Sequence, residues 1–223
     1  MSNNFLVSII PASVLCLMLI GGSIAELIGR KRTLVIGQTI IILGWIIIYF
    51  SSHFSMLLVG RFFVGAGIGV CLPVTTLQLS EIALIKMRGV LSMMGYLFMN
   101  AGCVYSLTVG ANLPLNILMI MAAIPSMFFL LISYFLPESP VWLMKKGYPE
   151  RAKESLLQLR GPKYDMNHEL KELENLVITQ VQDNTKWIDK LKELQTRNNA
   201  IPFIIMSTIF LLQVGLINEL YIL

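Results

Sequence analysis

Residues 137–199 read PESPVWLMKKGYPERAKESLLQLRGPKYDMNHELKELENLVITQVQDNTKWIDKLKELQTRNN, and they form the only long polar segment of the 223-residue chain. This segment carries 11 of the 17 Lys and Arg residues, from Lys145 to Arg197. One apolar run ends just before it, and another begins just after it. We therefore interpret it as a polar linker between two parts of the chain that lie in a membrane.

The composition supports this membrane location. Hydrophobic residues make up 56% of the chain and charged residues only 13%, whereas a soluble domain carries about 25% charged residues. The net charge of +4 does not indicate nucleic-acid binding, because the basic residues flank apolar runs, where they set the orientation of a membrane protein. We predict an integral membrane protein that contacts the lipid bilayer and has no nucleic-acid partner.

Six apolar runs are long enough to span a bilayer as a helix, which takes about 20 residues. They cover residues 5–28, 33–50, 56–79, 90–110, 115–136 and 200–223. The predicted fold is therefore that of an all-α membrane protein. It consists of a bundle of five spans at 1–136, a helical linker at 137–199 and a sixth span at 200–223.

The basic residues predict how these spans are oriented. Loops 29–32 and 80–89 carry Lys and Arg, as the linker does, whereas loops 51–55 and 111–114 carry none. Cytoplasmic loops are enriched in Lys and Arg, so this alternation places the linker in the cytoplasm. Arg61 is the one cation inside a predicted span. It either reaches the outer interface through its long side chain or faces a polar partner inside the bundle.

Local patterns predict how the helices pack. Gly65 and Gly69, four residues apart in an apolar run, favour close contact between two membrane helices. A phosphate-binding role is excluded because no strand precedes them. In the linker, Pro149 is expected to begin a first amphipathic helix that ends at Gly161. Asp165 is expected to cap a second helix, and a third follows toward residue 194.

No pattern of catalytic or metal-ligating residues accompanies these helices. His53 and His168 lie in different parts of the chain, and neither has a second ligand at the spacing of a metal site. Cys16, Cys71 and Cys103 fall within apolar runs and are expected to be small buried residues. We therefore expect no enzyme activity, no metal and no cofactor.

Short motifs lie near the ends of the predicted spans, most of them on the cytoplasmic side. They are GSIAELIGRKR at 22–32, Gly60-Arg61 and SEIA (80–83) at the two ends of the third span, Arg88-Gly89, and PESPVWL at 137–143. In this order they resemble the sugar porter family of the major facilitator superfamily. The LRG motif at 159–161, with Tyr164-Asp165 after it, is most similar to the insect facilitated trehalose transporters.

The resemblance implies twelve spans in two halves of six, joined by a cytoplasmic helical domain, in a protein of the plasma membrane. The six predicted spans match the second to the seventh, and residues 137–199 match the central linker. The family's first span and its last five would then lie outside this chain. We expect the chain to be either a fragment or a truncated product.

The resemblance also implies roles for charged residues near the cytoplasmic ends of the spans. Glu26, Arg30, Glu81, Arg88 and Glu138 would form a network of ion pairs that fastens the two halves together in the outward-open state. Considered without the family, the same residues would only anchor helix ends and set the orientation. A separate cation, Arg61, matches an outer, buried arginine of the family's fourth span.

Substrate contacts are implied in two of the spans. Gln213 and Asn218 match amide residues of the family's seventh span, and Tyr96 stands where the fifth span usually has a sugar-binding glutamine. Amide side chains suit a sugar because each offers a donor and an acceptor to hydroxyl groups. Leu212 and Leu216 depart from the seventh-span motif, so the identity of the sugar stays open.

Two functions follow as hypotheses. The first is a transmembrane sugar transporter of the hexose or trehalose type, facilitative and working by alternating access, of which this chain is an incomplete part. The second is a truncated relative that does not transport sugar and acts as an interaction or sensing protein in the membrane. A sugar is the expected small-molecule partner, and the rest of the porter or another porter chain is the expected protein partner.

Overall fold

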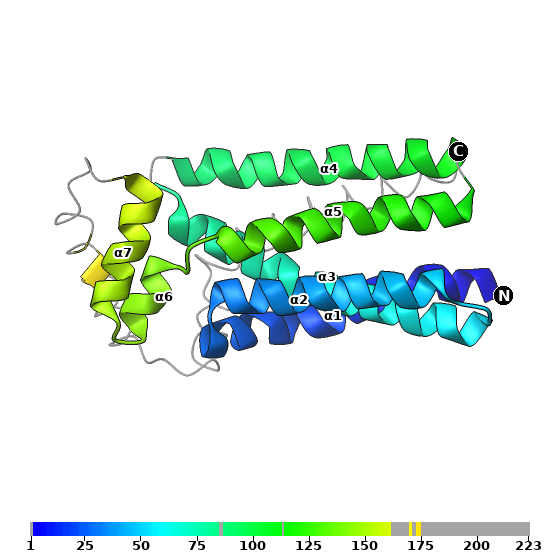
Figure 1. The fold of residues 1–223 in the computed structure, drawn as a ribbon, viewed down its shortest axis with the longest axis horizontal. Coiled ribbons are helices and arrows are strands. Elements are labelled where there is room, and N and C mark those ends of the chain that lie inside the picture. Colours follow the sequence, from blue (N-terminus) through cyan, green and yellow to red (C-terminus); the bar gives the residue numbers. More distant parts are fainter. Residues whose placement is uncertain (1, 85–86, 113, 162–169, 171–172, 175–223) are drawn as a thin grey trace, which may run out of the picture. The chain divides into compact units, whose positions relative to one another are not determined.

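The computed structural model describes residues 2–84, 87–112, 114–161, 170 and 173–174, all within one compact unit that covers residues 1–174. The regular elements of these described residues are all helices (Figure 1). Five are long and two are short: α1 (Ser2–Ile28), α2 (Arg30–Tyr49), α3 (Phe54–Ile82), α4 (Arg88–Asn112), α5 (Leu115–Phe135), α6 (Pro140–Lys145) and α7 (Pro149–Arg160).

The five long helices confirm the first five predicted spans. Each is long and apolar enough to cross a membrane, and each boundary lies within three residues of the predicted one. The amphipathic helix predicted to begin at Pro149 is confirmed as α7, which ends one residue before Gly161. The short helix α6, which precedes it in the same polar segment, was not predicted. The sixth predicted span, at 200–223, and the third linker helix lie outside the described residues. Of the second linker helix only residues 170 and 173–174 are described, and they are helical.

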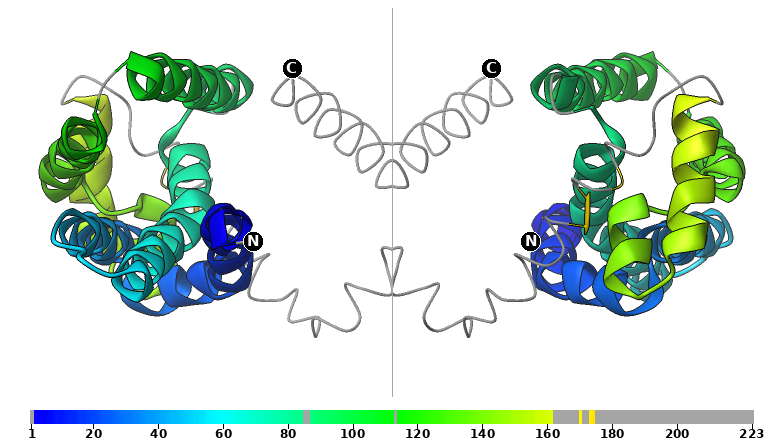
Figure 2. Two further views of the ribbon diagram at one scale, coloured as in Figure 1. Left: turned by 90° about the vertical axis from the view of Figure 1, so that its right-hand side faces the viewer. Right: turned by 90° about the vertical axis from the view of Figure 1, so that its left-hand side faces the viewer.

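Small residues bring α3 close to α1, as the spacing of Gly65 and Gly69 predicts. A Cβ atom built on Gly69 would lie 2.7 Å from the carbonyl oxygen of Val14, and one built on Gly65 would overlap the side chain of Ser13. Only glycine therefore lets the two backbones approach this closely. Figure 2 shows α1 (dark blue) and α3 (cyan) lying side by side.

A second set of glycines brings α3 close to α2. A Cβ atom on Gly67 would lie 2.6 Å from the carbonyl oxygen of Gly37, and one on Gly44 would lie 2.9 Å from the carbonyl oxygen of Gly60. The two contacts are about two helical turns apart on each helix, so the backbones touch at two levels. Nothing in the sequence pattern alone singled out Gly37 and Gly44.

An apolar cluster fills the space where α1, α2 and α3 meet. It consists of Ala25, Leu34, Ile41, Cys71 and Val74. The prediction that Cys71 is buried is therefore confirmed. For Cys16 and Cys103 the same prediction is wrong, because both lie on faces of α1 and α4 that no described helix covers.

The fourth helix has few neighbours among the described residues. α5 packs along α2, whereas α4 makes only sparse contacts with α3 and α5. No residue of α4 from Arg88 to Thr108 is buried. Its large apolar side chains are open to the surroundings, with Met93 and Phe98 each 71% exposed. Lipid or a protein segment outside the described residues must therefore cover α4.

Gly67→Ala should destabilise the contact between α2 and α3, because the added methyl group would meet the Gly37 carbonyl and the Ile41 side chain. Overpacking of this kind lowers the free energy of unfolding by about 1–3 kcal/mol. Denaturant-induced unfolding in detergent micelles measures the change.

Gly102→Ala on α4 is the matched control. Nothing lies within 4 Å of its added Cβ atom, so packing does not oppose the substitution. The higher helix propensity of alanine should leave stability unchanged or raise it by up to about 1 kcal/mol. Equal stability of the Gly67 and Gly102 variants would contradict the close contact between α2 and α3.

Candidate functional site

A one-residue turn sets the geometry of a polar cluster at one end of the bundle. α1 ends at Ile28 and α2 begins at Arg30, so Gly29 alone connects them. Gly29 has a φ of +105°, a value that favours glycine, and a Cβ atom there would lie 2.6 Å from Glu138 Oε2. The turn therefore brings the first residues of α2 directly against the Glu138 carboxylate.

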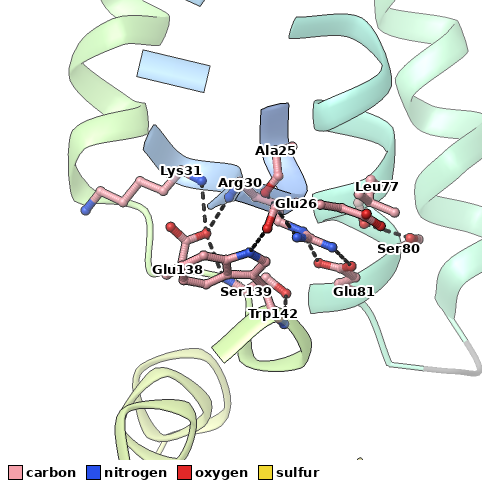
Figure 3. A network of polar contacts seen from close by, with 10 residues as sticks. All are labelled: Ala25, Glu26, Arg30, Lys31, Leu77, Ser80, Glu81, Glu138, Ser139 and Trp142. Atoms are coloured by element: carbon pink, nitrogen blue, oxygen red, sulfur yellow. Dashed lines mark hydrogen bonds and ion pairs between the residues drawn. The ribbon is translucent and has the colours of Figure 1, made fainter. Parts of the chain in front are cut away.

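Arg30, the first residue of α2, is only 1% exposed. Its guanidinium group contacts Glu81 of α3 twice: Nη2 lies 2.9 Å from Oε1, and Nε donates to Oε2 at 3.1 Å (Figure 3). Nη1 also donates to the carbonyl oxygen of Ala25 on α1 at 3.1 Å. The buried charge is thus paired with a carboxylate in the two-pronged geometry that suits arginine, and it joins three helices.

Glu138 binds the N-terminus of α2, although 108 residues separate it from Arg30 in the sequence. Its Oε1 accepts hydrogen bonds from the backbone N–H groups of Arg30 at 2.9 Å, Lys31 at 3.0 Å and its own neighbour Ser139 at 3.2 Å. The first N–H groups of a helix have no partner within the helix and carry partial positive charge. Glu138 supplies the cap that Gly29, which has no side chain, does not provide.

Three further hydrogen bonds fasten the segment that carries Glu138. Ser139 Oγ accepts from the Trp142 backbone N–H at 3.2 Å and so caps α6. Trp142 Nε1 donates to the carbonyl oxygen of Glu26 on α1 at 3.0 Å (Figure 3). Ser155 Oγ on α7 donates to the carbonyl oxygen of Glu138 at 2.5 Å. These bonds hold α6 and α7 against the adjoining ends of α1 and α2.

The structure brings together three of the five charged residues that the resemblance singled out, namely Arg30, Glu81 and Glu138. Glu26 lies beside them, but it contributes its backbone carbonyl, and its side chain is exposed. Arg88 begins α4, is exposed, and makes none of the contacts of this cluster.

Sequence reasoning missed the residues that position Glu138. The Ser139-Pro140 pair was a usable signal, since serine often precedes the first helical residue and proline often occupies it. Gly29 and Ser155 offered no comparable signal, because their partners are distant in the sequence. Arg61 lies inside a helix as expected, partly buried about two turns into α3.

A separate cavity of about 390 Å³ lies between α2, α3, α4 and α5. Tyr96 lines it, whereas Gln213 and Asn218 lie outside the described residues. Gln38, another lining residue, was not singled out from the sequence and is 8% exposed. Its Nε2 lies 3.8 Å from Cys71 Sγ, and its Oε1 has no hydrogen-bond partner among the described residues.

The polar cluster is suited to holding helix ends in one arrangement. Arg30 and Glu81 form an ion pair, and the Glu138 carboxylate accepts hydrogen bonds from backbone N–H groups. Each of these three charged groups therefore already has a partner within the cluster. Separating the partners of a buried ion pair costs free energy. Such a pair is therefore either formed or broken, with no stable intermediate separation. Contacts of this type bias the choice between two discrete conformations.

Comparisons with known proteins show which family this chain resembles. The family model described as "Sugar (and other) transporter" matches residues 2–222. "Sugar transporter ERD6-like 6" of Arabidopsis thaliana is 33% identical over 199 residues, which are 88% of this chain and 40% of that protein. "Facilitated trehalose transporter Tret1" of Apis mellifera ligustica is 32% identical over 212 residues, which are 95% of this chain and 42% of that protein. The chain thus spans about two fifths of the length of these curated relatives.

Solved structures of the E. coli xylose transporter XylE share the fold. Its inward-open conformation has a TM-score of 0.68 at 18% identity, and the match covers 82% of this chain and 46% of that chain. XylE bound to 6-bromo-6-deoxy-D-glucose, described as a proton:xylose symporter, has a TM-score of 0.62 at 21% identity. At these identities the likeness shows the fold alone, which is that of the major facilitator superfamily.

Glu81→Ala should strongly destabilise the bundle, because it leaves the buried Arg30 guanidinium group without its counter-charge. Removing one partner of a buried ion pair lowers the free energy of unfolding by about 3–5 kcal/mol. The double variant Arg30→Met/Glu81→Leu should show a smaller decrease in the free energy of unfolding, since it leaves no charge buried. Denaturant-induced unfolding in detergent micelles measures both.

Arg88→Gln is the control for these variants. It also removes a charge that the resemblance assigned to the network, but from an exposed position. Its free energy of unfolding should change by less than about 0.5 kcal/mol. If Glu81→Ala were as stable as Arg88→Gln, the ion pair would not hold the three helices together.

Proposed function

This chain belongs to the family of sugar (and other) transporters, and we propose that it is part of a sugar porter that works by alternating access. The match over residues 2–222 is the observation that carries the proposal. The proposed substrate is a sugar of the hexose or trehalose type, and the proposed transport is facilitative, as the name of the Apis mellifera relative describes for that protein. The proposed location is the plasma membrane.

We assign the six spans to positions two to seven of a twelve-span porter, with a five-span bundle at 1–136, a cytoplasmic linker at 137–199 and the first span of the second half at 200–223. The exposure of α4 supports a neighbouring helix outside the described residues, since none of its residues from Arg88 to Thr108 is buried. Gln38, in the adjoining cavity, supports it too, because its Oε1 has no hydrogen-bond partner among the described residues. One further apolar helix with a hydrogen-bond donor would satisfy both, and we assign that place to the porter's first span.

The polar cluster is proposed to act as the cytoplasmic latch of the outward-open state. Glu138 and Ser155 connect the linker helices to α2, so a movement at this end is transmitted to α6 and α7. Glu26 and Arg88 are exposed, which suits them to pair with charges of the second half. Rocking of the two halves would break these pairs and open the inner side.

Tyr96, Gln213 and Asn218 are the proposed sugar contacts. The place of Tyr96 on the cavity wall supports its role, and the amide groups of Gln213 and Asn218 suit sugar hydroxyls. Arg61, partly buried on α3, is the proposed outer buried charge.

A second function is favoured by residues that replace the family's usual ones. Tyr96 and Leu212 stand where glutamines are expected, and Leu216 stands where a glycine is expected. Fewer amide groups at the substrate positions would weaken sugar binding. The second candidate is therefore a membrane protein that does not transport but associates with a porter chain or senses sugar.

Uptake of radiolabelled trehalose and glucose tests the transport function. A complete porter that contains residues 1–223 should take up at least one of these sugars. Gln213→Ala should weaken sugar binding by about fivefold to tenfold, because it removes the hydrogen bonds of one amide group, and should leave expression unchanged. An equal loss of binding and expression would indicate a packing role for Gln213. Absence of uptake in the complete porter would favour the second candidate.

Glu138→Gln in the complete porter should loosen the outward-open state, because a neutral amide is a weaker acceptor for the N–H groups of α2. Labelling of a cysteine introduced at Ser92, on the cavity wall, should increase when a membrane-impermeant thiol reagent is added from the cytoplasmic side. Glu154→Gln, which neutralises an exposed carboxylate on α7, should not change the labelling rate. Unchanged labelling in the Glu138 variant would rule out its latch role.

A further inference from the structure

A second cavity, of about 550 Å³, lies between the first turn of α2 and the helices α6 and α7. Three cations line it, namely Lys31 and Arg32 of α2 and Arg151 of α7. Trp142 and Tyr148 form part of the same wall. The proposed transport mechanism gives none of these three cationic side chains a role.

Described carboxylates do not neutralise the three cations. No ion pair with a described residue is formed by any of the three, Lys31, Arg32 and Arg151. Two carboxylates line the same cavity, those of Glu138 and Glu154. Glu138 already accepts hydrogen bonds from the backbone of α2, and Glu154 is exposed on α7. The cavity therefore keeps an excess of positive charge.

Aromatic rings orient two of the cations without using up their hydrogen-bond donors. Lys31 Nζ lies 5.5 Å from the ring centre of Tyr134, and Arg151 Cζ lies 5.5 Å from the ring centre of Tyr148. Figure 3 shows the Lys31 side chain extending away from the Glu138 carboxylate. A ring attracts a cation through its face, so N–H groups of both side chains remain able to bind an anion.

The cavity lies at the level where the apolar helices end. Tyr134 is the penultimate residue of α5 and is 70% exposed. Tyrosine is enriched at the boundary between membrane and water, where its ring is apolar and its hydroxyl is hydrated. Headgroups of membrane lipids therefore reach this level, as do soluble molecules.

We propose that this cavity binds a phosphate monoester, the group that a phosphoinositide headgroup or a soluble phosphate ester carries. A monoester bears a charge of about −1.5 to −2 at neutral pH and three strong acceptor oxygens. The guanidinium forks of Arg32 and Arg151 offer matching donors, and Lys31 adds positive charge beside them. The volume falls in the range of about 300–1,000 Å³ that small-ligand sites occupy. A bound phosphate would bridge α2 and α7 and so stabilise the arrangement that Glu138 and Ser155 already favour.

Native mass spectrometry of the 223-residue chain in nanodiscs tests this site. One preparation contains phosphatidylcholine with phosphatidylinositol 4-phosphate, and a second contains phosphatidylcholine with phosphatidylinositol, which lacks the monoester. A third contains phosphatidylcholine alone and receives soluble inositol 4-phosphate. We expect the phosphorylated lipid to bind about tenfold more tightly than phosphatidylinositol. Comparable binding of the soluble ester would identify a soluble ligand as the source, and no preference for the monoester in either form would overturn the proposal.

Substitutions at exposed positions separate a specific site from general attraction. Arg32→Gln and Arg151→Gln should each weaken binding about fivefold, the effect of removing one cation near a membrane surface. Lys153→Gln removes a cation from the same helix as Arg151 but outside the cavity wall, and should leave binding unchanged. An equal loss of binding in the Lys153 and Arg151 variants would overturn the proposal of a specific site. Unfolding midpoints in phosphatidylcholine alone confirm that all three variants are folded.

Discussion

The buried guanidinium group of Arg30 is the constraint on which the arrangement of this bundle depends. A charge that is only 1% exposed is tolerated when it is paired, and here Glu81 of α3 and the Ala25 carbonyl of α1 pair it. Because Arg30 begins α2 directly after the turn at Gly29, its side chain joins three helices at one point. Glu138 binds the backbone of the same residue and adds α6 and α7 to the assembly.

Glycine contacts and the polar cluster constrain the helices in different ways. The contacts of α3 with α1 and α2 set how closely the helix axes approach, because carbonyl oxygens lie where a Cβ atom would be. The Arg30–Glu81 pair lies at the helix ends and tolerates little displacement, so it sets the axial position. Together they determine how α1, α2 and α3 pack against one another.

The close packing of α1, α2 and α3 contrasts with the sparse attachment of α4, and this contrast suits the alternating-access function that we propose. Alternating access needs groups of helices that move as bodies and surfaces along which they separate. α1 to α3 have the backbone contacts of such a body, whereas α4 offers an uncovered apolar face and one wall of the cavity that holds Tyr96 and Gln38. The cluster around Arg30 lies at one end of these three helices, where hydrogen bonds also connect it to α6 and α7.

By itself, the sequence determined the five described spans, the first linker helix and the close contact at Gly65 and Gly69, because these depend on runs and spacings within single segments. The family resemblance named Arg30, Glu81 and Glu138 without saying how they meet. Only the tertiary structure decided that Glu138 caps α2 while Glu26 stays exposed, and that an amide oxygen of Gln38 lies buried without a described partner. The reason is that Arg30 contacts Glu81 and Glu138 across 51 and 108 positions of sequence, and helix packing rather than local pattern brings such residues together.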